Sequence, residues 1–105
     1  MDSNGKLVRD LIPAIIRAGG AEPVIHIAEA AEYRIRLRDK LGEEVAEFLA
    51  ADEANGPGEL ADVLEVVRAL AADLGVDADE LEKIREAKAA ERGGFACRIV
   101  WKGNR

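Results

Sequence analysis

Residues 59–74 constrain the fold most, because they would be apolar nearly all the way round a helix. Leucine, valine and alanine fall on almost every side of this stretch at helical spacing. A helix of this kind belongs at the centre of a bundle, where other helices cover it. Apolar residues make up 49% of the chain and aromatic residues only 4%, so the core has to be built from aliphatic side chains.

The preceding stretch, residues 29–54, predicts a second long helix with one apolar face. Its apolar residues recur at three- and four-residue steps. They are Tyr33, Leu37, Leu41, Val45, Phe48 and Leu49. The sequence Asn55-Gly56-Pro57-Gly58 between the two stretches is the strongest breaker in the chain and predicts a turn. A connection this short makes the two helices antiparallel neighbours.

Shorter elements are predicted on either side of this pair. A short helix is expected after Asp10, its cap, with Pro13 in the first turn and Gly19-Gly20 at its end. A last helix is expected to run from Asp77, its cap, to Arg92, where two glycines stop it.

Two short segments near the ends of the chain predict strands. Residues 23–27 are β-branched and bounded by a proline, and residues 97–101 alternate in polarity. We expect these strands to pair with each other, because a lone strand leaves backbone groups without partners. The expected fold is therefore mainly all-α, an antiparallel helical bundle with two short terminal strands, in one domain over residues 1–105.

Charge and composition exclude several classes of protein. The chain has 21 acidic and 15 basic residues, a net charge of −6, which argues against binding of a nucleic-acid polymer. No apolar run has the length of about 18 residues that a membrane span needs, and we expect no membrane partner. Residues 1–6 are polar, so we expect no hydrophobic leader, and the one cysteine, Cys97, excludes an intrachain disulfide and a cysteine zinc site. We expect Cys97 to be buried and the protein to be cytoplasmic.

The informative polar feature is the placement of acids on the two central helices. Glu44 and Glu47 lie about 60° apart on one side of the first helix. Glu59 and Asp62 have the same spacing on the second helix. Carboxylates that lean together into the interior repel one another unless a cation compensates them. All-oxygen ligation suits Mg²⁺, or else Mn²⁺, and Mg²⁺ often takes substrate phosphates as further ligands. The alternative is that these glutamates form ordinary solvated helix faces.

Two pairs of basic residues are candidates for holding phosphates. Lys6 and Arg9 precede the first helix, and Lys88 and Arg92 stand one turn apart near the end of the last helix. The alternatives are an ordinary amphipathic N-terminal segment for the first pair and compensation of the helix dipole for the second. His26 is the single histidine, and we expect it to lie at the surface or in packing rather than in catalysis.

The acids and both ends of the chain resemble a known family. Glu43-Glu44-x-x-Glu47 followed by Glu59-x-x-Asp62 is similar to the signature of the MazG-like all-α nucleoside triphosphate pyrophosphohydrolases. Their superfamily includes phosphoribosyl-ATP pyrophosphohydrolase and dimeric dUTPases. The segments Lys6-Leu-Val-Arg-Asp-x-Ile-Pro13 and Arg92-Gly-Gly-Phe-x-x-Arg-Ile-Val100 resemble a short single-domain subgroup. The resemblance covers about residues 5–101.

This resemblance implies hydrolysis of a nucleoside triphosphate, or a related nucleotide, at the α–β phosphoanhydride, which gives a nucleoside monophosphate and pyrophosphate. It implies that Glu44, Glu47, Glu59 and Asp62 bind Mg²⁺. The implied catalytic residues are Glu43, Glu44 and Glu47, with Glu43 as an added ligand or base.

The resemblance also bears on substrate contacts and assembly. Lys88 and Arg92 match a Lys-x-x-x-Arg pair that contacts phosphates, and Arg85 stands where many members have Asn. It further implies a homodimer or a dimer of dimers, which would complete the bundle. Two other functions remain open at this point, namely a non-catalytic nucleotide-binding or regulatory helical module and a structural interaction protein.

Overall fold

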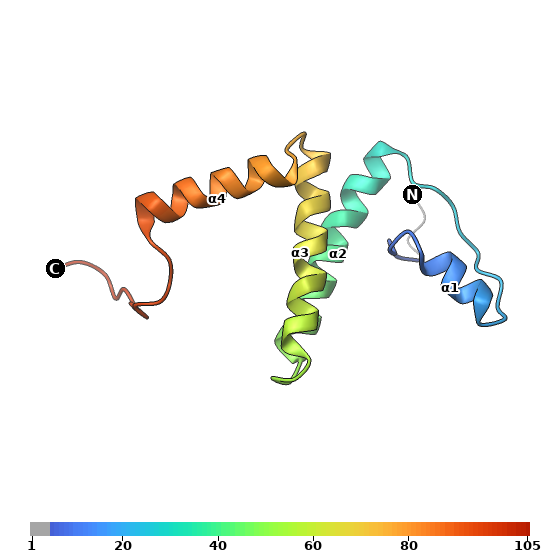
Figure 1. Ribbon diagram of the computed structural model, residues 1–105, viewed down its shortest axis with the longest axis horizontal. Helices are drawn as coiled ribbons and strands as arrows, with labels where there is room; N and C mark the ends of the chain where they lie inside the picture. Colours follow the sequence, from blue (N-terminus) through green and yellow to red (C-terminus); the bar gives the residue numbers. More distant parts are fainter. Residues whose placement is uncertain (1–4) are drawn as a thin grey trace.

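The computed structural model describes residues 5–105, so residues 1–4 of the expected single domain lie outside the described range. The described residues form four helices and no strand, which confirms a mainly all-α fold (Figure 1). In chain order, the helices are α1 (Ile12–Ala18), α2 (Ala30–Ala50), α3 (Gly56–Asp73) and α4 (Ala78–Arg92).

The centre of the molecule is the antiparallel pair of α2 and α3, as the sequence predicted (Figure 1). Its buried apolar side chains are Leu37 on α2 and Val66 and Ala71 on α3. At the end of the pair away from the α2–α3 connection, Arg34 Nε donates a hydrogen bond of 2.9 Å to Asp73 Oδ2. This bond joins the start of α2 to the end of α3, so the two helices run side by side over nearly their full length.

The connection between α2 and α3 differs from the predicted turn. Helix α2 ends at Ala50, and Gly56-Pro57-Gly58 forms the first turn of α3 rather than the turn itself. Proline fits there because the first N–H groups of a helix have no partner within the helix. The turn lies at residues 51–55, where Asp52 Oδ1 accepts hydrogen bonds of 2.9 Å from both the backbone N and the Nδ2 of Asn55.

Helix α1 begins one residue later than predicted. Its N-terminal flanking residue is Leu11, so the expected cap by Asp10 is wrong, although Pro13 lies in the first turn as predicted. In the described range, close backbone contacts between helices join α2 to α3 and α3 to α4, and none joins α1 to another helix. The position of α1 is therefore determined by side-chain contacts.

The two predicted strands are wrong. Residues 23–27 and 97–101 are irregular, and they lie at opposite ends of a molecule 60 Å long (Figure 1). Each segment is short and has no neighbouring strand within the described residues, so its backbone cannot form a ladder. The expected burial of Cys97 is also wrong, since its thiol is exposed. Within the described residues, the C-terminal tail is not packed against the rest of the chain.

Helix α4 leads away from the central pair (Figure 1). Its predicted cap is confirmed, since Asp77 Oδ1 accepts a hydrogen bond of 2.8 Å from the Glu80 backbone N. Its predicted stop is confirmed as well, because Gly93 has a φ of 81°, which favours glycine. The radius of gyration is 17.8 Å, against about 13 Å for a compact domain of this length.

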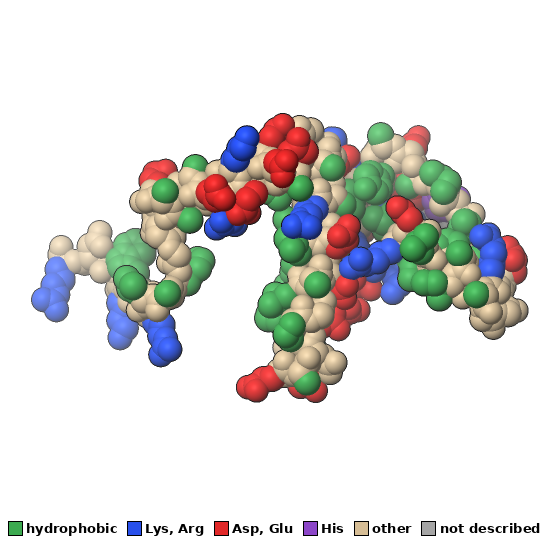
Figure 2. Space-filling model, viewed as in Figure 1, with side chains coloured by type: hydrophobic (Ala, Val, Ile, Leu, Met, Phe, Trp, Pro, Cys, Tyr) green, Lys and Arg blue, Asp and Glu red, His purple; other side chains and the backbone are tan. Residues whose placement is uncertain are grey.

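The open shape leaves many apolar side chains in water. Figure 2 shows them along α3, over α1 and on the C-terminal tail. Leu60 and Leu64 of α3 are about half exposed. Residues 5–105 contain no helix with the length and apolar character of a membrane span.

The Asp77 cap gives a test of the fold of α4. Asp77→Ala removes the side-chain oxygen that accepts from Glu80, and loss of such a cap costs about 1 kcal/mol. We expect amide hydrogen exchange in the first turn of α4 to become about fivefold faster, because this helix opens locally. Asp77→Asn is the matched control, since it keeps an acceptor and should leave the exchange rates near those of the wild type.

Candidate metal and nucleotide site

Three of the four predicted metal ligands lie together. Glu44, from the middle of α2, and Glu59 and Asp62, from the first two turns of α3, each offer a carboxylate oxygen within 4.8 Å of the others. The antiparallel pairing and the short connection place these three residues at the same height along the α2–α3 pair. Figure 2 shows acidic side chains gathered on the side of the α2–α3 pair that faces α1.

Two oxygens of this cluster lack a partner. Glu44 is only 7% exposed, and its Oε2 is buried without a hydrogen-bond partner in the described structure. The same is true of Glu59 Oε2. Burying an unpaired carboxylate oxygen is costly, so such groups usually face a ligand, an ion or water. Carboxylate oxygens are hard donors, and the residues present therefore fit a hard divalent cation.

Lys40, which is not among the site residues predicted from the sequence, supplies part of the compensating charge. Its Nζ lies 3.2 Å from Glu44 Oε1 and 3.3 Å from Glu43 Oε2. Burial alone would lower the pKa of Lys40, but its hydrogen bonds with Glu44 and Glu43 outweigh burial and raise the pKa. The signal was available, because lysine stands three and four residues before these acids on one helix.

Glu47, the fourth predicted ligand, lies at the exposed edge of the cluster. The charge of Glu44 is the main cause that raises the pKa of Glu47, followed by burial and the charge of Glu59. The two neighbouring carboxylates therefore make Glu47 a stronger base than a solvated glutamate.

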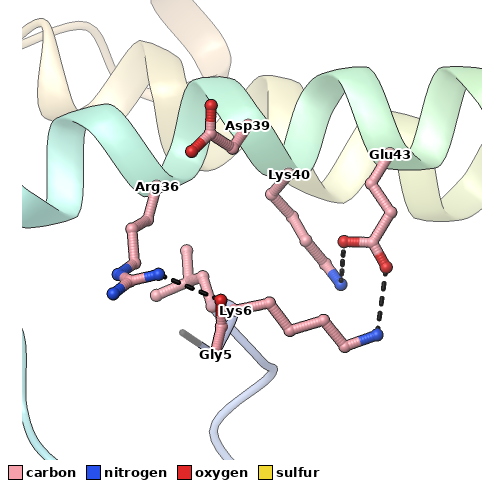
Figure 3. A pocket seen from close by; sticks show the side chains of 7 residues that line it. Gly5, Lys6, Arg36, Asp39, Lys40 and Glu43 are labelled. Carbon is pink, nitrogen blue, oxygen red and sulfur yellow. Dashed lines mark hydrogen bonds and ion pairs between the residues drawn. The ribbon is translucent and has the colours of Figure 1, made fainter. Parts of the chain in front are cut away.

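Glu43 lies next to the cluster, shares Lys40 with Glu44 and has Lys6 as a second partner (Figure 3). Lys6 Nζ lies 3.1 Å from Glu43 Oε1, and this hydrogen bond is the main cause that lowers the pKa of Glu43. In the same small pocket, of about 50 Å³, Arg36 Nη1 donates a hydrogen bond of 3.1 Å to the Gly5 carbonyl. Charged side chains of α2 thus hold the N-terminal segment in place.

The structure separates the four predicted phosphate-binding residues into two groups. Arg9 Nη2 lies 2.7 Å from Asp62 Oδ1, so Arg9 and Lys6 both meet acids of the predicted site. Lys88 and Arg92 stand on α4, which extends away from the α2–α3 pair, and one chain does not bring them to the acids (Figure 1).

A cleft of about 530 Å³ adjoins the acid cluster. The N-terminal segment and α1 form one wall, and α2 and α3 form the other. Glu44 and Asp62 belong both to the cluster and to the lining of the cleft, and most of the remaining lining is apolar. The sequence does not predict the cleft, because its two walls come from segments with no visible pairing signal.

The repulsion at Glu47 can be measured in the metal-free protein. Glu44→Gln removes the main cause of its raised pKa, so we expect the pKa of Glu47 to fall toward its ordinary value of 4.5 in an NMR titration of the carboxyl carbons. A pKa above 4.5 means that the folded state holds this proton more tightly than the unfolded state. The stability that it contributes is present below pH 4.5 and is lost as the pH rises through the folded pKa.

Asp39→Asn is the control for this titration, because Asp39 is an exposed acid of α2 whose charge does not contribute to the shift at Glu47. An unchanged pKa of Glu47 in Glu44→Gln would contradict the described geometry.

Comparison with known proteins supplies the family. The sequence model of the phosphoribosyl-ATP pyrophosphohydrolase family matches residues 8–89. An uncharacterised protein from Mycolicibacterium smegmatis is 55% identical over 47 residues, which cover 45% of this chain and 48% of that protein. The aligned part thus spans about half the length of this relative. No solved structure matches the chain. The match confirms the resemblance to the superfamily that includes MazG-like proteins, and the chain belongs to the phosphoribosyl-ATP pyrophosphohydrolase family.

Proposed function

We propose that this protein is a Mg²⁺-dependent nucleotide pyrophosphohydrolase. It cleaves a nucleoside triphosphate, or a related nucleotide, at the α–β phosphoanhydride with one water to give a nucleoside monophosphate and pyrophosphate. The observation that carries this proposal is the buried, unpartnered Glu44 Oε2 beside carboxylate oxygens of Glu59 and Asp62 within 4.8 Å. Membership in a pyrophosphohydrolase family supports hydrolase chemistry in general.

Glu44, Glu59 and Asp62 would hold the cation, and Glu47 stands beside them outside this group of three. When bound, a divalent cation neutralises phosphate oxygens and favours departure of the pyrophosphate. Within residues 5–105, neither the cysteine nor the histidine lies at this place as a nucleophile. Cys97 lies on the exposed tail, and His26 Nε2 pairs with Glu32 Oε2 at 2.9 Å.

Glu47 is the residue that we assign to proton transfer. It lies at the exposed edge of the cluster, where water reaches it, and as a carboxylate outside the group of three it can accept a proton of the attacking water. Glu43 is a weaker candidate for a base, because Lys6 and Lys40 both stabilise its ionised form.

Arg9 and Lys6 have a double role in this proposal. Without a cation, they neutralise Asp62 and Glu43. With a cation bound, Asp62 would be neutralised by it, and the Arg9 guanidinium would be available for a phosphate, which it matches in geometry. The side chains of Arg9 and Lys6 are more than half exposed, so both can change partner without disturbing the core.

Glu59→Gln tests the metal site and the reaction together. In the wild type we expect Mg²⁺ or Mn²⁺ to raise the melting temperature by mass action and to support pyrophosphate release from a nucleotide panel. In Glu59→Gln the metal-induced shift should largely disappear and turnover should fall about 100-fold or more, since metal stabilisation of phosphate charge is worth several kcal/mol. The circular dichroism should stay helical.

Glu53→Gln is the matched control, because Glu53 is an exposed acid of the turn before α3 and lies outside the cluster. It should keep both the melting shift and the turnover. Absence of pyrophosphate release from every nucleotide at saturating Mg²⁺ would refute the enzyme. Nucleotide binding without release would favour a non-catalytic nucleotide-binding module.

We further propose that a second copy of the chain completes the site. The single chain exposes apolar side chains along α3, α4 and the tail, and its radius of gyration exceeds that of a compact domain. Burial of this surface in a symmetric dimer would supply the missing core and would bring Lys88 and Arg92 of one copy to the acids of the other.

Mixed dimers test this arrangement. Arg92→Ala and Glu59→Gln should each be nearly inactive alone, because each symmetric dimer then has two defective sites. After mixing and exchange of subunits, the hybrid dimer has one site without either substitution, so activity should recover to about a quarter of the wild type. A mixture of Glu47→Gln and Glu59→Gln is the control and should stay inactive, since these two acids serve the same site. No recovery in proven hybrids would place Arg92 outside the partner's site.

A further inference from the structure

We propose that the C-terminal tail, residues 94–105 after α4, docks in the cleft of a second copy of the chain, against the aliphatic side chains at the start of α1. This inference rests on the second copy in the proposed function and not on the reaction, so it holds for a catalytic and for a non-catalytic protein.

The tail exposes its large apolar side chains almost completely. Phe95 is 97% exposed and Trp101 is 77% exposed, and Ile99 and Val100 are exposed to a similar extent (Figure 2). Within the part of the chain that the structure describes, the hydrogen bonds of the tail stay between residues 95 and 104. Apolar side chains that gather in this way on a surface mark an interaction site.

The charge of the tail indicates which partner it fits. The tail holds three basic residues and no acid, which leaves 12 bases against 21 acids in the rest of the chain. The basic residues are Arg98, Lys102 and Arg105. A nucleic acid or an anionic membrane would attract the tail but would be repelled by the acidic rest of the molecule. A second copy of this chain is itself acidic, so it attracts the tail without that repulsion.

The cleft offers an aliphatic face and two acids. Val8, Leu11 and Ile15 line the cleft at steps of three and four residues and are exposed, and they are called the aliphatic face below. Asp10 and Glu65 line the same cleft, and within residues 5–105 neither of them belongs to an ion pair. The lining of the cleft is therefore apolar with an excess of negative charge, as a basic apolar segment requires.

Tail and cleft match each other, but one chain does not bring them together. The apolar side chains of the tail can cover the aliphatic face, while Arg98 and Lys102 can pair with Asp10 and Glu65. Neither of these basic residues forms an ion pair in the described range. Figure 1 shows that the tail and α1 lie at opposite ends of the molecule, because α4 leads the tail away from the central pair. The cleft that the tail enters therefore belongs to a second copy.

Trp101 is the single tryptophan, so its fluorescence reports docking of the tail without a label. As the protein concentration rises through the Kd of the dimer, measured by sedimentation, we expect the emission to move to shorter wavelength and quenching by acrylamide to fall. Leu11→Asp places a charge on the aliphatic face and should raise this Kd at least about tenfold, as loss of an interface anchor does. Val24→Asp is the matched control, because Val24 is fully exposed outside the cleft and its substitution should leave the Kd near the wild-type value.

Charge reversal tests whether the contact forms between two chains. One variant carries Arg98→Glu and Lys102→Glu in the tail, and the other carries Asp10→Lys and Glu65→Lys in the cleft. Each variant alone sets like charges against each other, so its Kd should rise at least about tenfold. In an equimolar mixture, each tail meets a cleft of opposite charge on the other chain, and a Kd near the wild-type value should return. All four residues are exposed, so circular dichroism should stay helical in both variants.

Several results would overturn the inference. Shielding of Trp101 that does not depend on concentration would place the tail on its own chain. Shielding only by anionic vesicles or by a polynucleotide would assign the tail to such a polyanion instead. A mixture of the two reversed variants that stays as weak as either one would remove the pairing of charges between copies.

These failures are distinct from failure of the proposed function. A dimer in which acrylamide still quenches Trp101 fully removes the tail contact and leaves the hydrolase and its second copy standing. A protein that is monomeric at every concentration removes the tail contact and the second copy together. Release of pyrophosphate, measured separately, then decides whether the proposed reaction stands.

Discussion

Electrostatic repulsion among carboxylates at the boundary of α2 and α3 is the constraint on which the site depends. Glu44 is buried there, and Glu59 and Asp62 face it across the antiparallel pair. Ionised acids this close together in a partly desolvated site destabilise the fold unless cations compensate their charge. The chain supplies part of that compensation through Lys40 and Arg9. Two buried oxygens stay without a partner, and they mark where the compensation is incomplete.

The same charges explain how the N-terminal segment is held. Its α1 helix makes no close backbone contact with another helix in the described range, whereas Lys6 and Arg9 pair with Glu43 and Asp62. The segment is therefore tied to the site by groups that a metal and a phosphate would compete for. Exposed ion pairs contribute little to stability, so this exchange of partners needs little free energy.

The sequence predicted the helices well because each signal was local. Apolar periodicity indicated α2 and α3, and the Asp77 cap and the glycines fixed both ends of α4. The spacing of Glu44, Glu59 and Asp62 predicted their meeting, because it needed only two helices joined by a short turn. The prediction of strands at residues 23–27 and 97–101 was wrong, because β-branched composition does not indicate whether a partner strand lies close enough to pair. Lys40 and the cleft depend on side-chain packing between distant segments, which periodicity does not encode.

Glu44, Glu59 and Asp62 are the residues proposed to bind a divalent cation, and paramagnetic broadening by Mn²⁺ tests that binding most directly. In an NMR spectrum of the carboxyl carbons, a small fraction of an equivalent of Mn²⁺ should broaden the signals of these three residues first. Signals of exposed acids elsewhere, such as Glu53 and Glu82, should stay sharp, and excess Mg²⁺ should reverse the effect. Uniform broadening of all exposed acids, with Glu44 no more affected than the rest, would contradict the account.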